Sequence, residues 1–141
     1  GSIPIREILE IDKIIPTAEN LLGVPYKWGG KTSLGFDCSG LVQSVLKVCG
    51  LNIPRDSYQQ WDYFFSFSNT IDLLSSEPGD IHFFGLKKKI THVGLSTGGT
   101  GILHSQGCVK RESLDPKHDD FNAKLLDIYL STYSIKCKFQ Q

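Results

Sequence analysis

The spacing of apolar and polar residues divides the chain into a helical first half and a strand-rich second half. Apolar residues recur at helical spacing over 38–49 and Gly50 is a typical stop residue, which together predict a helix there. Asp37 lies where an N-cap is expected. A shorter helix is predicted with Pro16 in its first turn and Gly23 at its end. A third is predicted to start within Pro54-Arg55-Asp56-Ser57.

After residue 80 the apolar spacing changes to the two-residue period of β-strands. Residues 24–30 are predicted to be a loop, and Lys87-Lys88-Lys89 a solvated hairpin connection. Because helices come first and strands follow, the predicted fold class is α+β, with N-terminal helices packed on a central antiparallel sheet. The predicted strands cover residues 81–84, 91–97, 101–105, 109–113 and 133–139.

Chain length and net charge constrain only the number of domains and the class of partner. The 141 residues predict one domain, and 15 basic against 15 acidic residues leave no excess charge for nucleic acid or a polybasic membrane contact. No apolar run approaches the ~20 residues of a membrane span. The chain begins Gly1-Ser2 and contains no methionine. We therefore expect residues 1–15 to be an expression scar and a lead-in or linker stub before a domain over 16–141, with an N-terminal accessory domain outside this fragment.

The cysteines carry no metal-site signature. No two of them have CxxC spacing, so neither a metal site nor a cofactor is expected, and buried reduced thiols are the favoured interpretation. The four are Cys38, Cys49, Cys108 and Cys137.

Cys38 is the candidate nucleophile. It opens the helix over 38–49, and a helix N-terminus stabilises a thiolate through its N–H groups and its dipole. His92 and His104 lie on consecutive predicted strands, as base and orienting group. They share a face of the sheet if their hairpin loop is odd, as in a three-residue Thr97-Gly98-Gly99 loop, or if a bulge compensates.

Each of these residues also has a structural interpretation. A cysteine at the start of an apolar helix is often a core thiol, and a strand histidine is more often packed than catalytic. His82, beside two phenylalanines, is predicted to be structural, and His118 to lie in a solvated loop. The catalytic hypothesis therefore depends on the combination of Cys38 with the two histidines.

That combination resembles the NlpC/P60 family of cell-wall cysteine peptidases. The resemblance covers roughly residues 18–105 and follows the family's order of motifs. The matching motifs are Gly23-Val24-Pro25-Tyr26-Lys27-Trp28-Gly29-Gly30, Gly35-Phe36-Asp37-Cys38-Ser39-Gly40-Leu41-Val42, Pro54-Arg55-Asp56-Ser57-Tyr58-Gln59-Gln60, Pro78-Gly79-Asp80-Ile81-His82-Phe83-Phe84, Thr91-His92-Val93-Gly94 and Leu103-His104-Ser105.

The resemblance implies a papain-like NlpC/P60 fold and a bacterial enzyme that hydrolyses peptidoglycan stem peptides, at the bond between D-γ-glutamate and a diamino acid. It implies catalytic roles for Cys38, His92 and His104, and a location in the cell envelope, periplasmic or secreted. It implies substrate contacts for three more residues, Tyr26, Asp37 and Ser39. Two alternatives stay open at this stage. One is a related amidase or acyltransferase on another amide or thioester, and the other is a non-catalytic wall-binding module.

Overall fold

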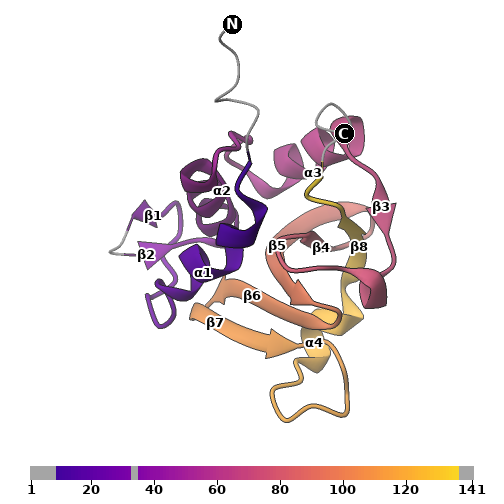
Figure 1. The fold of residues 1–141 in the computed structure, drawn as a ribbon. Coiled ribbons are helices and arrows are strands. Elements are labelled where there is room, and N and C mark those ends of the chain that lie inside the picture. Colours follow the sequence, from indigo (N-terminus) through magenta and orange to yellow (C-terminus); the bar gives the residue numbers. More distant parts are fainter. Residues whose placement is uncertain (1–8, 33–34, 137–141) are drawn as a thin grey trace, which may run out of the picture.

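A six-stranded antiparallel sheet, in the order β3-β8-β4-β5-β6-β7, forms the centre of the computed structural model (Figure 1). The structure describes residues 9–32 and 35–136. A separate antiparallel pair, β1 (Lys31–Thr32) and β2 (Gly35–Phe36), precedes the helix that carries Cys38. The strands of the main sheet are β3 (Thr70–Ile71), β4 (Ile81–Leu86), β5 (Lys89–Gly98), β6 (Gly101–Gln106), β7 (Cys108–Ser113) and β8 (Tyr129–Tyr133).

The helices gather mainly on one side of this sheet. In Figure 1 the indigo and purple N-terminal helices lie beside the orange strands, and α4 lies at the lower end of the sheet. This arrangement confirms the predicted α+β class with N-terminal helices on an antiparallel sheet. The helical elements are η2 (Ile11–Lys13), α1 (Ile14–Glu19), α2 (Cys38–Cys49), α3 (Ser57–Phe67), η3 (Leu73–Ser75) and α4 (Ala123–Asp127).

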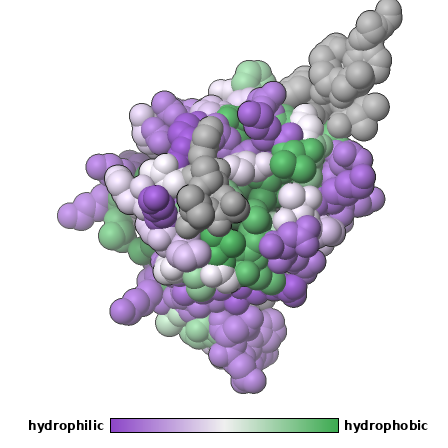
Figure 2. All heavy atoms as spheres, turned by 90° about the vertical axis from the view of Figure 1, so that its left-hand side faces the viewer, coloured by the Kyte–Doolittle hydropathy of each residue, from purple (hydrophilic) through white to green (hydrophobic). Residues whose placement is uncertain are grey.

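Alternation along the strands builds two apolar layers. The larger layer joins α2 and α3 to the strand residues that face them, among them Phe83, Val93 and Leu103. The smaller layer lies around Phe84 and Ile102, with Leu125 of α4. Figure 2, turned so that the left-hand side of Figure 1 faces the viewer, shows an apolar strip between hydrophilic margins.

The helix predictions over the first 70 residues are largely confirmed. α2 has the expected bounds, and Gly50 ends it with a left-handed φ of 110°. α3 begins after Asp56, whose side chain and that of Gln59 form a capping box. α1 starts two residues before Pro16 and ends at Glu19, short of the predicted Gly23. Ile14 is fully buried in the main core.

The predicted last strand is wrong over residues 134–136, which are not part of a strand. β8 covers Tyr129–Tyr133, and the chain leaves the ladder where the N–H of Ile135 donates to Asp80 Oδ1 at 2.9 Å. Residues 137–139, the rest of the predicted strand, lie outside the described residues. The alternating pattern that suggested a strand there reflects the burial of Ile135 in the main core.

The cysteines of the described chain are free thiols. Cys38 and Cys49 are buried and Cys108 is partly exposed, while Cys137 falls outside the described residues. Among the described residues, no helix combines the length and apolar character that a membrane crossing requires. His82 is buried and bonds Thr132, as its structural interpretation predicted.

Candidate active site

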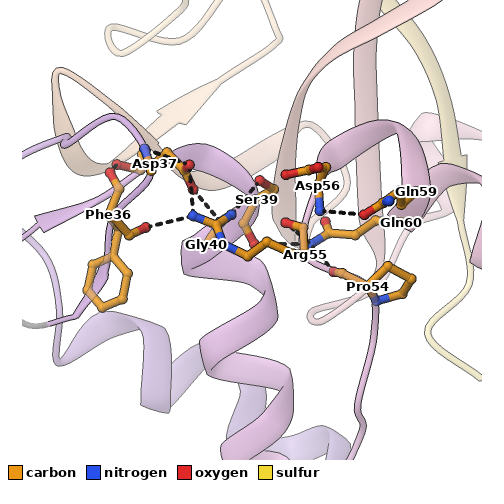
Figure 3. Close-up of polar contacts among 12 residues, drawn as sticks. Phe36, Asp37, Ser39, Gly40, Pro54, Arg55, Asp56, Gln59 and Gln60 are labelled. Atoms are coloured by element: carbon orange, nitrogen blue, oxygen red, sulfur yellow. Dashed lines mark hydrogen bonds and ion pairs between the residues drawn. The ribbon is translucent and has the colours of Figure 1, made fainter.

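Cys38 is the first residue of α2, directly after its N-cap. Asp37 Oδ1 accepts a hydrogen bond from the Gly40 N–H at 2.6 Å, which confirms the predicted cap (Figure 3). A Cβ at position 40 would lie 2.2 Å from the Gly30 carbonyl oxygen, so only glycine allows this approach. The local sequence thus fixes the thiol at the helix N-terminus.

Arg55 connects the first turn of α2 to the start of α3. Its guanidinium donates to Asp37 Oδ2 at 2.9 Å, to Ser39 Oγ at 3.0 Å and to the Gly30 carbonyl at 3.3 Å. Figure 3 shows it lying between the Asp37 and Ser39 side chains. Because Arg55 donates to the Ser39 oxygen, the Ser39 hydroxyl is left to donate its own proton elsewhere.

Two buried side chains hold the segments on either side of Cys38. Gln60 Nε2 donates to the Ser39 carbonyl at 3.0 Å and the Pro54 carbonyl at 2.9 Å, which ties α3 to α2. Ser105 Oγ donates to the Phe36 carbonyl at 2.8 Å, which ties β6 to the strand that leads into Asp37. The position of Cys38 is therefore braced from both the helical layer and the sheet.

His92 and His104 share one face of the sheet. His92 Nε2 lies 2.8 Å from His104 Nδ1, so the expected shared face is confirmed. Of the two arrangements that the sequence allowed, the compensating bulge is the one present, not an odd loop. The register runs from Ser96↔Ile102 to Gly98↔Gly101, so two residues form the turn and a bulge at Thr97 restores the parity.

The hydrogen-bonded row continues beyond His104. His104 Nε2 lies 2.8 Å from Glu112 Oε1 on β7, and Asn122 Nδ2 donates to that same oxygen at 3.0 Å. Lys110 Nζ is 3.7 Å from it. Asn122 is also the N-cap of α4, where its Oδ1 accepts the Leu125 N–H at 3.0 Å.

The thiol of Cys38 meets the sheet beside His92. The backbone N–H of Val93, the residue after His92, is close enough to the sulfur to lower the pKa of Cys38. Burial raises the pKa of Cys38, while the bonds from Val93 and from the helix-start N–H groups act in the opposite direction. Within the described chain no hydrogen bond joins Cys38 directly to His92.

Both histidines of the row are held neutral. Burial, His104 and Lys110 lower the pKa of His92 to about 3. Burial also lowers the pKa of His104, although Glu112 acts against this. Burial alone would raise the pKa of Glu112, but hydrogen bonds from Asn122 and His104 outweigh it and hold that pKa below its usual range. The row is therefore a carboxylate followed by two neutral imidazoles.

A pocket of about 690 Å³ opens over the thiol. Of the residues predicted from the sequence, it brings together Cys38, Tyr26, Asp37 and Ser39. Desolvation and the neighbouring Cys38 both raise the pKa of Tyr26, which keeps its phenol protonated. The two histidines are buried and are not among the residues that line the pocket. The remaining lining residues are Trp28, Gly29, Arg55, Asp56, Ser57, Tyr58, Ile90 and Thr91.

Sequence reasoning missed Arg55, Gln60, Glu112 and Asn122. Arg55 and Gln60 lay in a recognised motif without an assigned role. Glu112 had a usable signal, because a tight turn at Gly107 places 104, 110 and 112 on one face. Asn122 had none, since its five-residue helix was not predicted. In the described part of the chain, no cluster of three or more His, Cys, Asp or Glu side chains could hold a metal ion.

The sequence model of the NlpC/P60 family matches residues 23–127, three quarters of the chain. The chain is 41% identical over 97 residues to a gamma-D-glutamyl-L-lysine dipeptidyl-peptidase of Bacillus subtilis, a match that covers 67% of this chain and 31% of that protein. It is 39% identical over 96 residues to a gamma-DL-glutamyl hydrolase of the same organism, a match that covers 65% of this chain and 22% of that protein.

A solved structure agrees in fold. A crystal structure of an NlpC/P60 family protein from Bacillus cereus superposes with a TM-score of 0.72 at 28% identity, over 86% of this chain and 39% of that one. The chain therefore spans less than half the length of each of these three relatives.

Proposed function

The chain belongs to the NlpC/P60 family, and from that premise we propose that it is the catalytic domain of a cysteine peptidase of the bacterial cell envelope. The substrate is a peptidoglycan stem peptide, cut between D-γ-glutamate and the diamino acid. One observation carries the proposal. A cysteine at a helix N-terminus lies in an open pocket, next to the strand that carries one of two hydrogen-bonded histidines.

In this proposal Cys38 attacks the scissile carbonyl and His92 accepts the thiol proton. The bond to His104 uses His92 Nε2, so Nδ1 is the ring nitrogen left for the thiol. With the pKa of Cys38 raised and that of His92 lowered, the resting pair is thiol and imidazole, not a preformed ion pair. Proton transfer then accompanies formation of the sulfur–carbon bond, after substrate closes the contact between the two side chains.

The later steps return the proton. The His92 imidazolium donates to the amine of the diamino acid as the carbon–nitrogen bond breaks, which leaves a thioester on Cys38. Water, deprotonated by His92, hydrolyses that thioester and frees the thiol. The Cys38 N–H at the start of α2 and the Tyr26 phenol are the proposed donors to the oxyanion, at about 10²–10³ in rate for each donor.

Asp37 and Ser39 are proposed to hold the free amino end of the stem peptide. Arg55 already neutralises Asp37, so the carboxylate would share its charge between Arg55 and the incoming ammonium. Ser39 Oγ accepts from Arg55, so its hydroxyl is suited to donate to a substrate carbonyl. We therefore assign the ammonium to Asp37 and the neighbouring carbonyl to Ser39.

A second substrate is favoured by the similarity to a gamma-DL-glutamyl hydrolase. A γ-linked glutamate chain presents the same amide bond but places a glutamate, not a diamino acid, after the cut. An amide or thioester of another kind and a non-catalytic wall-binding role remain the wider alternatives. The intact row of Cys38, His92 and His104 favours catalysis over binding alone.

Mass spectrometry of digests tests the proposal. Wild type and Cys38→Ala are incubated separately with L-Ala-γ-D-Glu-L-Lys, with its diaminopimelate counterpart and with a γ-linked glutamate oligomer. We expect wild type to release L-Ala-D-Glu from a tripeptide and Cys38→Ala to release nothing. Cleavage of the oligomer alone would transfer the assignment to the second substrate. No cleavage of any substrate, or cleavage by Cys38→Ala, would contradict the proposal.

A further inference from the structure

A histidine bonded to a histidine leaves the direction of proton donation undefined. Each neutral ring carries one N–H and one lone pair, so the bond between His92 Nε2 and His104 Nδ1 can be made in two ways. If His92 donates, its Nδ1 keeps a lone pair and can accept the Cys38 proton. If His104 donates, His92 carries its proton on Nδ1 and cannot act as a base. A group outside the pair must therefore determine which of the two histidines donates.

The choice can be traced from the backbone of α4. The Leu125 N–H can only donate, so the atom of Asn122 that it meets must be the amide oxygen. The Asn122 amide nitrogen is then the group that faces Glu112 Oε1, 3.0 Å away, and it too can only donate. Glu112 Oε1 must therefore accept, as an ionised carboxylate does, and Lys110 at 3.7 Å favours the same state.

The carboxylate then sets both rings. His104 Nε2, 2.8 Å from Glu112 Oε1, must carry the proton and donate it. Neutral His104 thus presents a lone pair at Nδ1, which accepts from His92 Nε2–H at 2.8 Å. His92 Nδ1 is left unprotonated. The direction of donation is uniform along the row, from His92 to His104 to Glu112.

We propose that Glu112, held by Asn122, is a positioning residue that fixes the tautomers of His104 and His92 and so keeps the nitrogen beside Cys38 basic. The inference rests on the proposed roles of Cys38 and His92 and adds a carboxylate to them. It also supplies a negative charge that a histidine as third group lacks. When His92 becomes an imidazolium, that charge stabilises it through His104, as a carboxylate does in a Ser-His-Asp triad.

The first test is Glu112→Gln, with Glu19→Gln as the matched control. Glu19 pairs with Arg111 of the same strand and bonds neither histidine, so this control makes the same chemical change away from the row. We expect Glu112→Gln to lower kcat by about 10–100-fold with little change in KM. This is less than the ~10⁴ known when a carboxylate that contacts the base directly is replaced. We expect Glu19→Gln to match wild type.

The second readout needs no substrate and so separates this inference from the proposed function. In wild type labelled with ¹⁵N-histidine, ring spectra at pH 7 should show His92 and His104 protonated at Nε2 only. Glutamine at position 112 removes the charge but keeps an oxygen that can accept from Asn122 and His104, so Glu112→Gln should keep the wild-type tautomers. In Glu112→Leu, which has no acceptor, a fraction of His92 should carry its proton at Nδ1, and iodoacetamide should alkylate Cys38 several-fold more slowly. If peptide cleavage fails in wild type while these changes appear, only the substrate assignment falls.

Asn122→Asp keeps the test informative if Glu112→Leu does not fold. Aspartate caps α4 as asparagine does but brings an acceptor to Glu112 in place of a donor. We expect alkylation of Cys38 to become slower than in wild type as the pH rises and the new carboxylate ionises. Wild-type tautomers and alkylation rates in a folded Glu112→Leu, or wild-type alkylation rates in Asn122→Asp across that range, would overturn the inference.

Discussion

Because Gly94 has no Cβ, it leaves room for His104 on the neighbouring strand. Gly94→Ala tests how strongly the geometry of the histidine pair depends on that room. A Cβ at this position would lie 2.9 Å from His104 Cβ and 2.6 Å from Ile102 Cδ1. An ordinary contact of this kind is 3.4–4 Å, so His104 or β5 must shift by about 0.5 Å or more. Such a shift stretches the 2.8 Å bond between His92 and His104 to about 3.3 Å, beyond the usual range for that bond.

Two effects of different size follow from this displacement. Overpacking of this degree costs about 1–3 kcal/mol of unfolding free energy, which for a domain of this length lowers Tm by roughly 3–12 °C. Misplacing a base by half an ångström to one ångström costs on the order of 10²-fold in rate. We therefore expect kcat to fall far more than the folded fraction at assay temperature.

The assay compares peptide cleavage rates with thermal melts for Gly94→Ala, Ile102→Val and the double variant. Ile102→Val removes the Cδ1 atom responsible for the 2.6 Å contact but leaves His104 untouched. The double variant should regain part of the lost Tm while kcat stays low. Wild-type kcat in a folded Gly94→Ala, or recovery of kcat together with Tm in the double variant, would refute this reasoning.

Three further outcomes are expected. In peptide-cleavage assays, with thermal melts to confirm folding, Cys38→Ala should be inactive and His92→Ala nearly inactive. His104→Ala should lose less activity than either, and His104→Gln should keep more activity than His104→Ala. Equal losses of activity in His92→Ala and His104→Ala would contradict their separate roles. Gln60→Leu should lose about 1–3 kcal/mol in urea unfolding, because two buried carbonyls lose their donor; an unchanged midpoint would remove that brace. Burial lowers the pKa of His82 to about 4, so its contribution is complete above pH 6.5, the unfolded value, and is lost as pH falls from there towards 4. His82→Gln should reduce the change in unfolding free energy over that pH range by up to about 3 kcal/mol. A pH dependence as steep as that of wild type would exclude His82 as its source.

The sequence was sufficient to predict those parts of the site that depend on residues close together along the chain. Asp37, Cys38 and Gly50 each occupy helix-end positions with local physical causes, so α2 could be predicted residue by residue. The shared face of His92 and His104 followed from strand parity, although the bulge at Thr97 could not be chosen over an odd loop. His92 and His104 belong to one hairpin, so they are close together in sequence.

The missed features depend on contacts between distant segments. Arg55 reaches Asp37 across 18 positions, and its partner is set by how α3 packs against α2. Asn122 can bond Glu112 because it is the N-cap of a five-residue helix that follows a long loop beside β7. A helix this short has no apolar periodicity from which it could be predicted. The strand predicted over 133–139 failed for a similar reason, since the Asp80 side chain draws Ile135 out of the ladder.

Competition between thiols for a small alkylating reagent tests the central claim most directly. Cys108 is more exposed than Cys38, and burial raises the pKa of Cys38, so neither accessibility nor its own resting acidity gives Cys38 an advantage. If His92 activates Cys38, iodoacetamide at pH 7 followed by peptide mapping should label Cys38 first in wild type and Cys108 first in His92→Ala. Cys108 leading in wild type, or Cys38 keeping its lead in His92→Ala, would contradict activation of Cys38 by His92.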